Sequence, residues 1–362
     1  MRPAFTSTTQ KAGFCVLLLF LLTCPAVIGK KLLPPREQLY ASTSWGAGAF
    51  PYLHDQIFSE TNDIDIAFMG SSPIWWGIDT PHVQAELTRS LGRPAIVRSL
   101  CWNWNSLDAF YFIAKDLLAH RHVRMIVFCD LTPGSSDTAH VQASHWFRLA
   151  DNAGDLGGLG WRAKASFYAS AIQGMPRNLV GWFRADLPAI DSENISWGDF
   201  KQVANPAHRL GSLPLRMSSY HPFKDVTVTN TGGAQAVLAC PPDSPSAFEF
   251  SHNPLPPMQV AFAGKIAALA AQNQVRLVYL HMPKIPELGS QAIPENADWP
   301  ALFQNRLTLV GIPAATLYAG QSRDEVTQLY WDFQHLNQNG QVYFTRVITS
   351  RLLQLYETQN QP

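Results

Sequence analysis

The chain has few cysteines and no excess of either charge. Five of its 362 residues are cysteine, and only Cys101, Cys129 and Cys240 lie outside an apolar N-terminal stretch. This odd count gives no disulfide framework, and the sequence has no Cys/His spacing of a zinc site. Lysine plus arginine and aspartate plus glutamate both number 27. The balance argues against a nucleic-acid partner, because such proteins carry a basic patch.

Charge is also missing from residues 12–29, which lie between Lys11 and the pair Lys30 and Lys31. Eighteen uncharged residues are at the short end for a membrane span and the long end for a signal sequence. We expect residues 1–30 to be an N-terminal membrane anchor or a cleaved signal segment. Either places the remainder outside the cytoplasm, membrane-anchored or secreted, at the periplasmic or cell-surface face.

The rest of the chain alternates predicted strands and helices. Residues 31–60 contain Pro and Gly punctuation and are expected to be a linker. Strands near 64–69, 95–100 and 123–129 are separated by helices near 81–90 and 107–118, and this alternation favours parallel strands with right-handed crossovers. We therefore expect residues 61–362 to form an α/β domain, a three-layer α/β/α sandwich with a doubly wound parallel sheet.

This alternation is lost over about 135–257, which we expect to be a large loop-rich insertion over the strand ends. It resumes with a helix near 258–272 and a strand at 275–280. A helix at 299–308, a weaker strand at 314–317 and a last helix over about 338–357 complete the expected domain.

The first strand ends abruptly at Gly70-Ser71-Ser72-Pro73, and Thr80-Pro81 is expected to open the next helix with Thr80 as its N-cap. Ligands in open α/β sheets bind beyond the carboxyl ends of strands. Ser71 and Ser72 are therefore candidates for a nucleophile or an anion-binding turn, although no glycine-rich phosphate loop surrounds them.

A second chemical motif lies near the far end of the chain, where Asp332 precedes His335 by three residues, just before the last predicted helix. A serine hydroxyl becomes a nucleophile when an imidazole takes its proton, and an aspartate orients and stabilises that imidazole. Ser, Asp and His together are the parts needed for acyl transfer.

These two motifs resemble the SGNH (GDSL-like) hydrolase superfamily. Gly70-Ser71-Ser72 with Gly77 is similar to its first block, and Asp332-Phe333-Gln334-His335, extended by Leu336, Asn337 and Gly340, is similar to its last. The resemblance covers roughly residues 60–135 and 258–357. It implies Ser72 as the nucleophile, His335 as the base and Asp332 as the residue that orients His335.

Within that superfamily the chain looks most like the membrane-anchored group that serves O-acylation of cell-surface polysaccharides, which includes alginate-acetylation and teichoic-acid D-alanylation proteins. The resemblance implies an O-acetyltransferase or esterase, a membrane partner that supplies the acyl group, and no metal or organic cofactor. Two alternatives stay open: a secreted lipase-like esterase that uses the same residues, and a non-catalytic glycan-binding protein on the same fold.

The expected oxyanion donors depart from the family pattern. The backbone N–H of Ser72 can serve, with Asn103 as a side-chain donor and Trp104 as a further candidate. Cys101 and Trp104 stand where the family has glycines, and Asp130 stands where it has an asparagine.

Aromatic and histidine side chains also gather near the predicted strand ends. Trp75, Trp76 and Trp102 are candidates for a platform that stacks on sugar rings, although packing is the commoner role for such residues. Trp104 and Trp146 belong to the same group. His140, His145 and His281 are more often hydrogen-bonded structural residues than catalytic ones.

Overall fold

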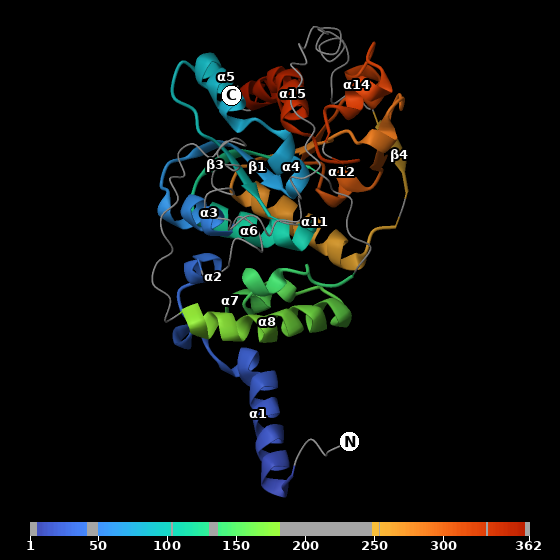
Figure 1. Ribbon diagram of the computed structural model, residues 1–362. Helices are drawn as coiled ribbons and strands as arrows, with labels where there is room; N and C mark the ends of the chain where they lie inside the picture. Colours follow the sequence, from blue (N-terminus) through green and yellow to red (C-terminus); the bar gives the residue numbers. More distant parts are fainter. Residues whose placement is uncertain are drawn as a thin grey trace.

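A computed structural model describes residues 6–41, 50–102, 104–129, 137–181, 248–252, 254–330 and 332–358 (Figure 1). Its strands are β1 (Ile64–Gly70), β2 (Val97–Cys101), β3 (Val123–Phe128), β4 (Phe248–Ser251), β5 (Arg276–Leu280), β6 (Ile293–Asn296) and β7 (Leu307–Val310). Its longer helices are α1 (Thr8–Val27), α5 (Thr80–Leu91), α6 (Leu107–His120), α8 (Trp161–Gly181), α11 (Pro257–Gln272) and α15 (Gln338–Thr358). Its shorter helices are α2 (Glu37–Ala41), α3 (Phe50–His54), α4 (Ser72–Gly77), α7 (Leu149–Asn152), α12 (Trp299–Leu302), α13 (Ala314–Leu317) and α14 (Arg323–Thr327).

Five strands form one parallel sheet in the order β2-β1-β3-β5-β7. The chain passes from β1 to the edge strand β2 and then crosses back to β3 on the other side of β1. Helices α5 and α15 cover one face of the sheet, and α6 and α11 cover the other (Figure 1). The predicted doubly wound α/β/α sandwich is confirmed. Its topological switch point, where such sheets bind ligands, lies between β1 and β3.

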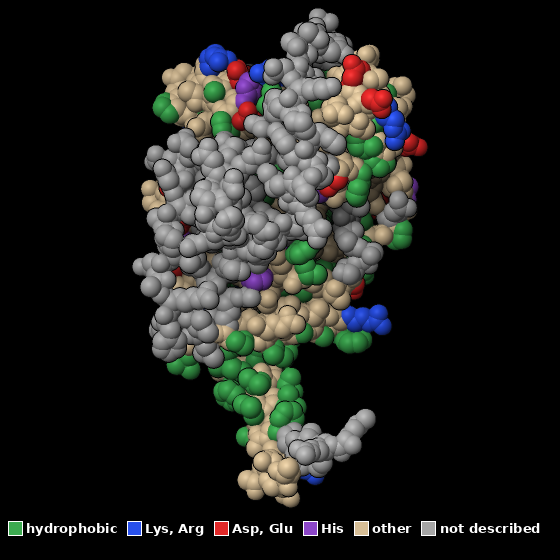
Figure 2. All heavy atoms as spheres, in the orientation of Figure 1, with side chains coloured by type: hydrophobic (Ala, Val, Ile, Leu, Met, Phe, Trp, Pro, Cys, Tyr) green, Lys and Arg blue, Asp and Glu red, His purple; other side chains and the backbone are tan. Residues whose placement is uncertain are grey.

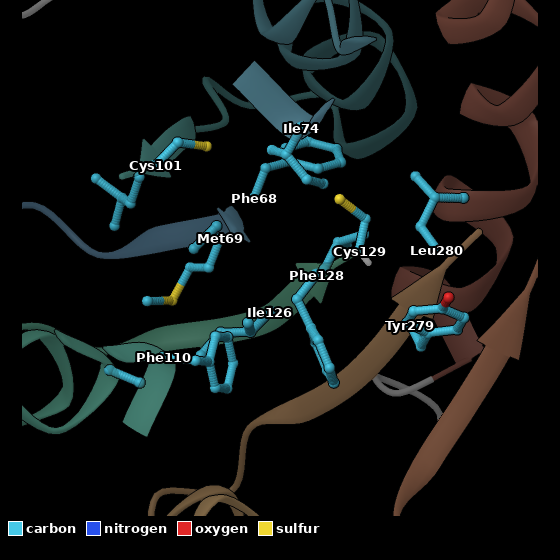
Figure 3. Close-up of a cluster of buried hydrophobic side chains, with 14 of the residues drawn as sticks. Phe68, Met69, Ile74, Cys101, Phe110, Ile126, Phe128, Cys129, Tyr279 and Leu280 are labelled. Carbon is cyan, nitrogen blue, oxygen red and sulfur yellow. The ribbon is translucent and has the colours of Figure 1, made fainter. Parts of the chain in front are cut away.

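The sheet core supports the turn that follows β1. All seven residues of β1 are buried, as expected for a central parallel strand. Figure 3 shows Phe110 of α6 beside Phe128 of β3, with ring centroids 4.8 Å apart. Ile74 of α4 lies across the sheet from them, and a Cβ on Gly70 would be 3.3 Å from Ile74. The first turn of α4 is thus packed directly on the end of β1.

The segment expected to be a linker is instead part of the domain. Residues 30–32, 37–41 and 50–59 form short helices, and Tyr40, Phe50, Leu53 and Ile57 have no exposed surface. Proline and glycine punctuation led to the linker prediction, but apolar residues between these positions pack into the core. Gly46 and Gly48 lie outside the described residues.

In the described parts of the 135–257 insertion, residues 137–160 form turns and short helices, but α8 and β4 are regular elements that a loop-rich insertion did not lead us to expect. Helix α8 packs its Phe167 against Phe112 of α6 and Phe262 of α11, at centroid distances of 5.9 Å each, so it covers the outside of that helical layer. Strand β4 pairs in parallel with β6 in a second, two-stranded sheet. The prediction for residues 182–247 lies outside the described residues.

Three local predictions were wrong. The helix expected at 299–308 ends at Leu302, because Gln304 and Asn305 take left-handed backbone conformations with φ of 56° and 58°. The last sheet strand is therefore β7, and residues 314–317, expected as a strand, form α13. The N-cap of α5 is Asp79, whose side chain accepts the His82 N–H, and Thr80 is the first helical residue.

Helix α1 is the one element in the described part of the chain that is long and apolar enough to cross a membrane. Only Cys24 and Pro25 of its residues are buried, and its apolar side chains form the projecting stalk in Figure 2. A signal sequence has the same character. The finding is compatible with membrane anchoring.

Candidate active site

Ser72 is placed by the junction of β1 and α4. Ser71 occupies the N-cap position of α4, Ser72 is its first residue, and Pro73 follows, where a missing N–H costs no helical hydrogen bond. The Ser71 carbonyl accepts the N–H groups of Ile74 and Trp75. Ser71 is buried at 3% exposure, whereas Ser72 is partly exposed. The geometry therefore separates two serines that local sequence alone does not.

His335 lies within hydrogen-bond distance of both Ser72 and Asp332, the other two residues predicted as a triad. The Ser72 Oγ is 2.8 Å from the His335 Nε2, and the His335 Nδ1 is 2.7 Å from the Asp332 Oδ2. The carboxylate accepts the proton on Nδ1, so Nε2 is the unprotonated nitrogen of the neutral ring and can accept the Ser72 hydroxyl proton. His335 is buried, and the Asp332 side chain is 39% exposed.

Asp332 is held as an anion by three hydrogen-bond donors of the same short loop. Its Oδ1 accepts the backbone N–H groups of Gln334 and His335, both at 2.8 Å. Burial raises the pKa of Asp332, but the hydrogen bonds from the His335 ring and the two backbone N–H groups outweigh it and hold the pKa below its ordinary value. The carboxylate is therefore ionised at neutral pH and can stabilise an imidazolium at His335.

The two ends of the loop that carries Asp332 and His335 are held together by backbone pairing. Tyr330 and Leu336 form an antiparallel bridge, and Asn337, which is buried, follows directly. The Asn337 Oδ1 caps α15 by accepting the N–H groups of Asn339 and Gly340 at 2.9 and 3.1 Å. Its Nδ2 donates to the carbonyls of Gln328 and Tyr330. One side chain thus joins the start of α15 to the residues before the catalytic loop.

Two further contacts tie this loop to the segment after β5. The Ile285 N–H donates to the Phe333 carbonyl at 2.9 Å, and the Tyr330 hydroxyl donates to the Pro283 carbonyl at 2.8 Å. A Cβ on Gly77 would collide with Met282 of the same segment. The end of α4, the segment after β5 and the catalytic loop therefore pack as one unit.

Of the three candidate oxyanion donors, Ser72 and Trp104 belong to the described residues. The Ser72 N–H, at the open start of α4, has no acceptor among the described residues. The Trp102 N–H donates to the Gly70 carbonyl at 3.0 Å, which holds the segment after β2 beside the Ser71-Ser72 turn. Trp104 has a left-handed φ of 60°, a conformation that favours glycine and costs another residue about 1–2 kcal/mol. Asn103 and Asp130 lie outside the described residues.

The predicted tryptophan platform is corrected by burial. Trp75, Trp76 and Trp102 are 8%, 4% and 2% exposed, so their faces are covered by protein, and Trp75 packs edge-on against Tyr52. The exposed aromatic side chains nearest the site in sequence are Trp104 at 56% and Phe333 at 59%. Phe333 was missed, although its position inside the Asp-x-x-His motif was a usable signal.

The histidines at other strand ends have structural contacts. His145 stacks on Phe50. His281, at the end of β5, places its Nε2 2.8 Å from Glu287 and its Nδ1 3.6 Å from Glu295. His140 is buried, and its backbone N–H donates to Asp108. Within the described residues, no group of three or more His, Cys, Asp or Glu side chains is placed to hold a metal ion.

The fold and the geometry define a class of site: a Ser–His–Asp arrangement at the switch point of a doubly wound α/β/α sandwich. In the comparisons with known proteins, no family model and no curated protein matches this chain.

Proposed function

We propose that the chain is a membrane-anchored serine esterase or O-acyltransferase that acts on acyl esters of a cell-surface polysaccharide. The observation that supports this best is the pair of short hydrogen bonds joining Ser72 to His335 and His335 to Asp332. Ser72 and His335, more than 250 positions apart in sequence, meet there, and the contact of Asp332 with Nδ1 favours the His335 tautomer that acyl transfer requires.

In this mechanism the Ser72 Oγ attacks the acyl carbon of the ester while the His335 Nε2 takes the hydroxyl proton. The carbonyl oxygen becomes an oxyanion, which the Ser72 N–H is placed to bind. The ester C–O bond then breaks, His335 returns its proton to the departing alcohol oxygen, and the acyl group remains on Ser72. A hydroxyl of the acceptor, or water, next attacks this acyl-serine with His335 as base, which frees Ser72. Asp332 stays ionised throughout and stabilises the imidazolium.

A glycan substrate is favoured over a lipid ester by the exposed surroundings of the catalytic loop. Asp332 is partly exposed, and Trp104 and Phe333 present aromatic rings to solvent, the kind of surface on which sugar rings stack. The similarity of the two sequence blocks to the polysaccharide O-acylation group points the same way. It also implies a membrane protein as the acyl donor and an extracytoplasmic location, with α1 as the anchor.

The lipase-like alternative predicts faster turnover of long-chain than of short-chain acyl esters, whereas glycan O-acylation predicts the reverse. The non-catalytic alternative predicts glycan binding without any reaction of Ser72.

The decisive experiment is fluorophosphonate labelling of the full chain in detergent. We expect labelling of the wild type and of Ser71→Ala, because Ser71 is buried, and none of Ser72→Ala or His335→Ala. Equal circular dichroism spectra and melting temperatures serve as folding controls. A folded wild type that stays unlabelled, alone and in membranes with its acyl-donor partner, would contradict the enzymatic proposal and leave the binding protein.

A further inference from the structure

Helix α8 lies where α1 leaves the domain. The buried residues Cys24 of α1 and Met175 of α8 belong to one small apolar cluster with Leu33. The Tyr168 hydroxyl of α8 donates to the Leu22 carbonyl of α1 at 2.6 Å. Figure 1 shows α1 leading away from the domain and meeting α8, which runs in a different direction. The contact therefore fixes α8 across the last turns of the apolar helix.

The two faces of α8 differ in character. Ala163, Phe167 and Ala171, spaced four residues apart, are buried in the core of the domain, and Met175, one turn further on, is buried against α1. The exposed residues are Trp161, Arg162, Lys164, Ala165, Ala169, Gln173 and Pro176, of which Ala165, Ala169, Gln173 and Pro176 line the side opposite the buried residues. The sequence of α8 contains no aspartate or glutamate. Its exposed first turn carries Trp161, Arg162 and Lys164, and small or uncharged side chains follow along the outer face.

The composition of this outer face matches that of a membrane–water boundary. Tryptophan, lysine and arginine are enriched there, because each combines an apolar body with a polar end. Trp161 is 75% exposed, and the Arg162 guanidinium lies 5.6 Å from the centre of its ring. Figure 2 shows basic and apolar side chains together at that end of α8. Leu32, 70% exposed, and Lys31 lie between α1 and α2, on the chain that joins the stalk to the domain.

From these observations we propose that α8 lies flat on an anionic phospholipid bilayer, with Trp161, Arg162 and Lys164 among the lipid headgroups. A helix that crosses the membrane along α1 holds α8 parallel to the bilayer plane, at the depth where α1 leaves the apolar layer. Two attachments, one through the span and one along the surface, then fix the orientation of the whole domain. This inference rests on α1 as a membrane span and does not depend on the chemistry of Ser72.

One consequence concerns the position of the catalytic loop. Helices α6 and α11 lie between α8 and the sheet, and His335 lies three residues before α15, which covers the opposite face of the sheet (Figure 1). The Ser72 site is therefore separated from the bilayer by a layer of helices. It faces substrates in the aqueous phase rather than lipids in the leaflet beneath it.

The test uses the full chain in vesicles of phosphatidylglycerol and phosphatidylcholine. A fluorophore is attached at Ala165→Cys on α8 or, as the matched control, at Asp324→Cys on α14, both exposed, in a chain with Cys15→Ser and Cys240→Ser. Lipids with a nitroxide at the headgroup quench fluorophores at the surface. We expect strong quenching at position 165 and little at position 324. Adding Arg162→Glu and Lys164→Glu should reduce quenching at 165 about threefold or more, because the charge attraction becomes repulsion.

A measurement without substitutions supports the same conclusion. Hydrogen exchange of residues 161–171 in the wild type should be slower in anionic vesicles than in neutral detergent, and exchange of α14 should not change. Equal quenching at positions 165 and 324 would overturn the proposal. So would a chain that fails to float with the vesicles after an alkaline wash, because α1 would then not be a span.

Discussion

Asp332 makes three hydrogen bonds that an asparagine cannot reproduce together. Its two oxygens accept two backbone N–H groups and the Nδ1–H of His335. The amide of Asp332→Asn has a single acceptor oxygen, so its NH2 group must face either the backbone donors or the imidazole. If the amide donates to Nδ1, the ring proton moves to Nε2, which can no longer take the Ser72 proton.

We therefore expect Asp332→Asn to slow fluorophosphonate labelling by about 10³–10⁴-fold with little change in melting temperature. Asp324→Asn, at an exposed carboxylate of α14, is the control and should label like the wild type. A labelling rate of Asp332→Asn close to that of the wild type would remove Asp332 from the proposed triad.

Individual site residues differed in how far the sequence could predict them. Asp332 and His335 lie three residues apart, so local spacing lets them meet, whereas the pairing of Ser72 with His335, 263 positions away, came from the family resemblance. Packing was the commoner expectation for Trp75 and Trp76, but the sequence could not decide it, because their burial depends on which side of the six-residue helix α4 faces the core. The choice of Ser72 over Ser71 rested on resemblance, and burial of Ser71 now supplies a physical reason.

At the scale of elements, α15 depends on a glycine for its close approach to the catalytic loop. A Cβ on Gly340 would collide with the Leu329 carbonyl and lie 2.7 Å from the Leu336 side chain. Leu329 cannot easily move, because its carbonyl accepts the Asn337 N–H at 2.9 Å. Replacing glycine by alanine normally stabilises a helix by about 0.5–1 kcal/mol, but here the collision should reverse the sign.

We expect Gly340→Ala to lower the free energy of unfolding by about 1–3 kcal/mol and to slow labelling of Ser72. Gly264→Ala in α11, where a Cβ meets nothing within 4 Å, should instead raise it by about 0.5–1 kcal/mol. Urea titrations of both variants measure the difference, and a stabilised Gly340→Ala would show that the loop has room to shift.

His281 makes the end of β5 sensitive to pH. Burial lowers the pKa of His281, but hydrogen bonds to Glu287 and Glu295 outweigh it and raise the pKa to about 8. Glu295 also accepts the Trp299 Nε1–H at 3.2 Å and the Tyr279 hydroxyl. Because the folded state holds the proton more tightly than the unfolded chain, the stabilisation is complete below about pH 6.5 and is lost as pH rises through about 8.

The free energy of unfolding should accordingly decline by about 2 kcal/mol between pH 6.5 and pH 9 through this group. His281→Gln, which cannot titrate, should flatten that part of the profile. Urea titrations at a series of pH values test this, and an unchanged slope in His281→Gln would assign the pH dependence to other groups.

Predictions at element level succeeded where an apolar run was both long and clearly bounded, as in β1, β5 and α11. They failed after residue 299, where helix and strand were exchanged. The left-handed conformations of Gln304 and Asn305 that end this helical region carry no strong sequence signal, since neither residue is glycine. A four-residue strand such as β7 is also too short for its periodicity to be distinguished from the end of a helix.

At the scale of the whole molecule, contacts between distant residues explain why the domain was expected to begin at residue 61, although residues before it belong to the same core. Arg36 donates to both oxygens of Asp116 on α6, at 2.6 and 2.7 Å, and to the Trp146 carbonyl at 3.0 Å. The Tyr40 hydroxyl donates to the same carboxylate. These partners are about 80–110 positions away in sequence, so no local pattern in 31–60 could reveal them.

The last prediction follows from this boundary and compares chains that begin at Lys31 and at Thr61. The second lacks Leu39, Tyr40, Phe50, Leu53 and Ile57, which are almost completely buried. At about 1.5–3 kcal/mol for each buried side chain, the loss is roughly 8–15 kcal/mol, as large as the entire stability of a typical domain. It also removes Arg36, leaving the buried Asp116 without its cation.

We expect the chain from Lys31 to melt cooperatively and react with fluorophosphonate at Ser72, and the chain from Thr61 to show neither property. A cooperative melt of the shorter chain near the temperature of the longer one would mean that residues 31–60 cover the domain without supporting its fold.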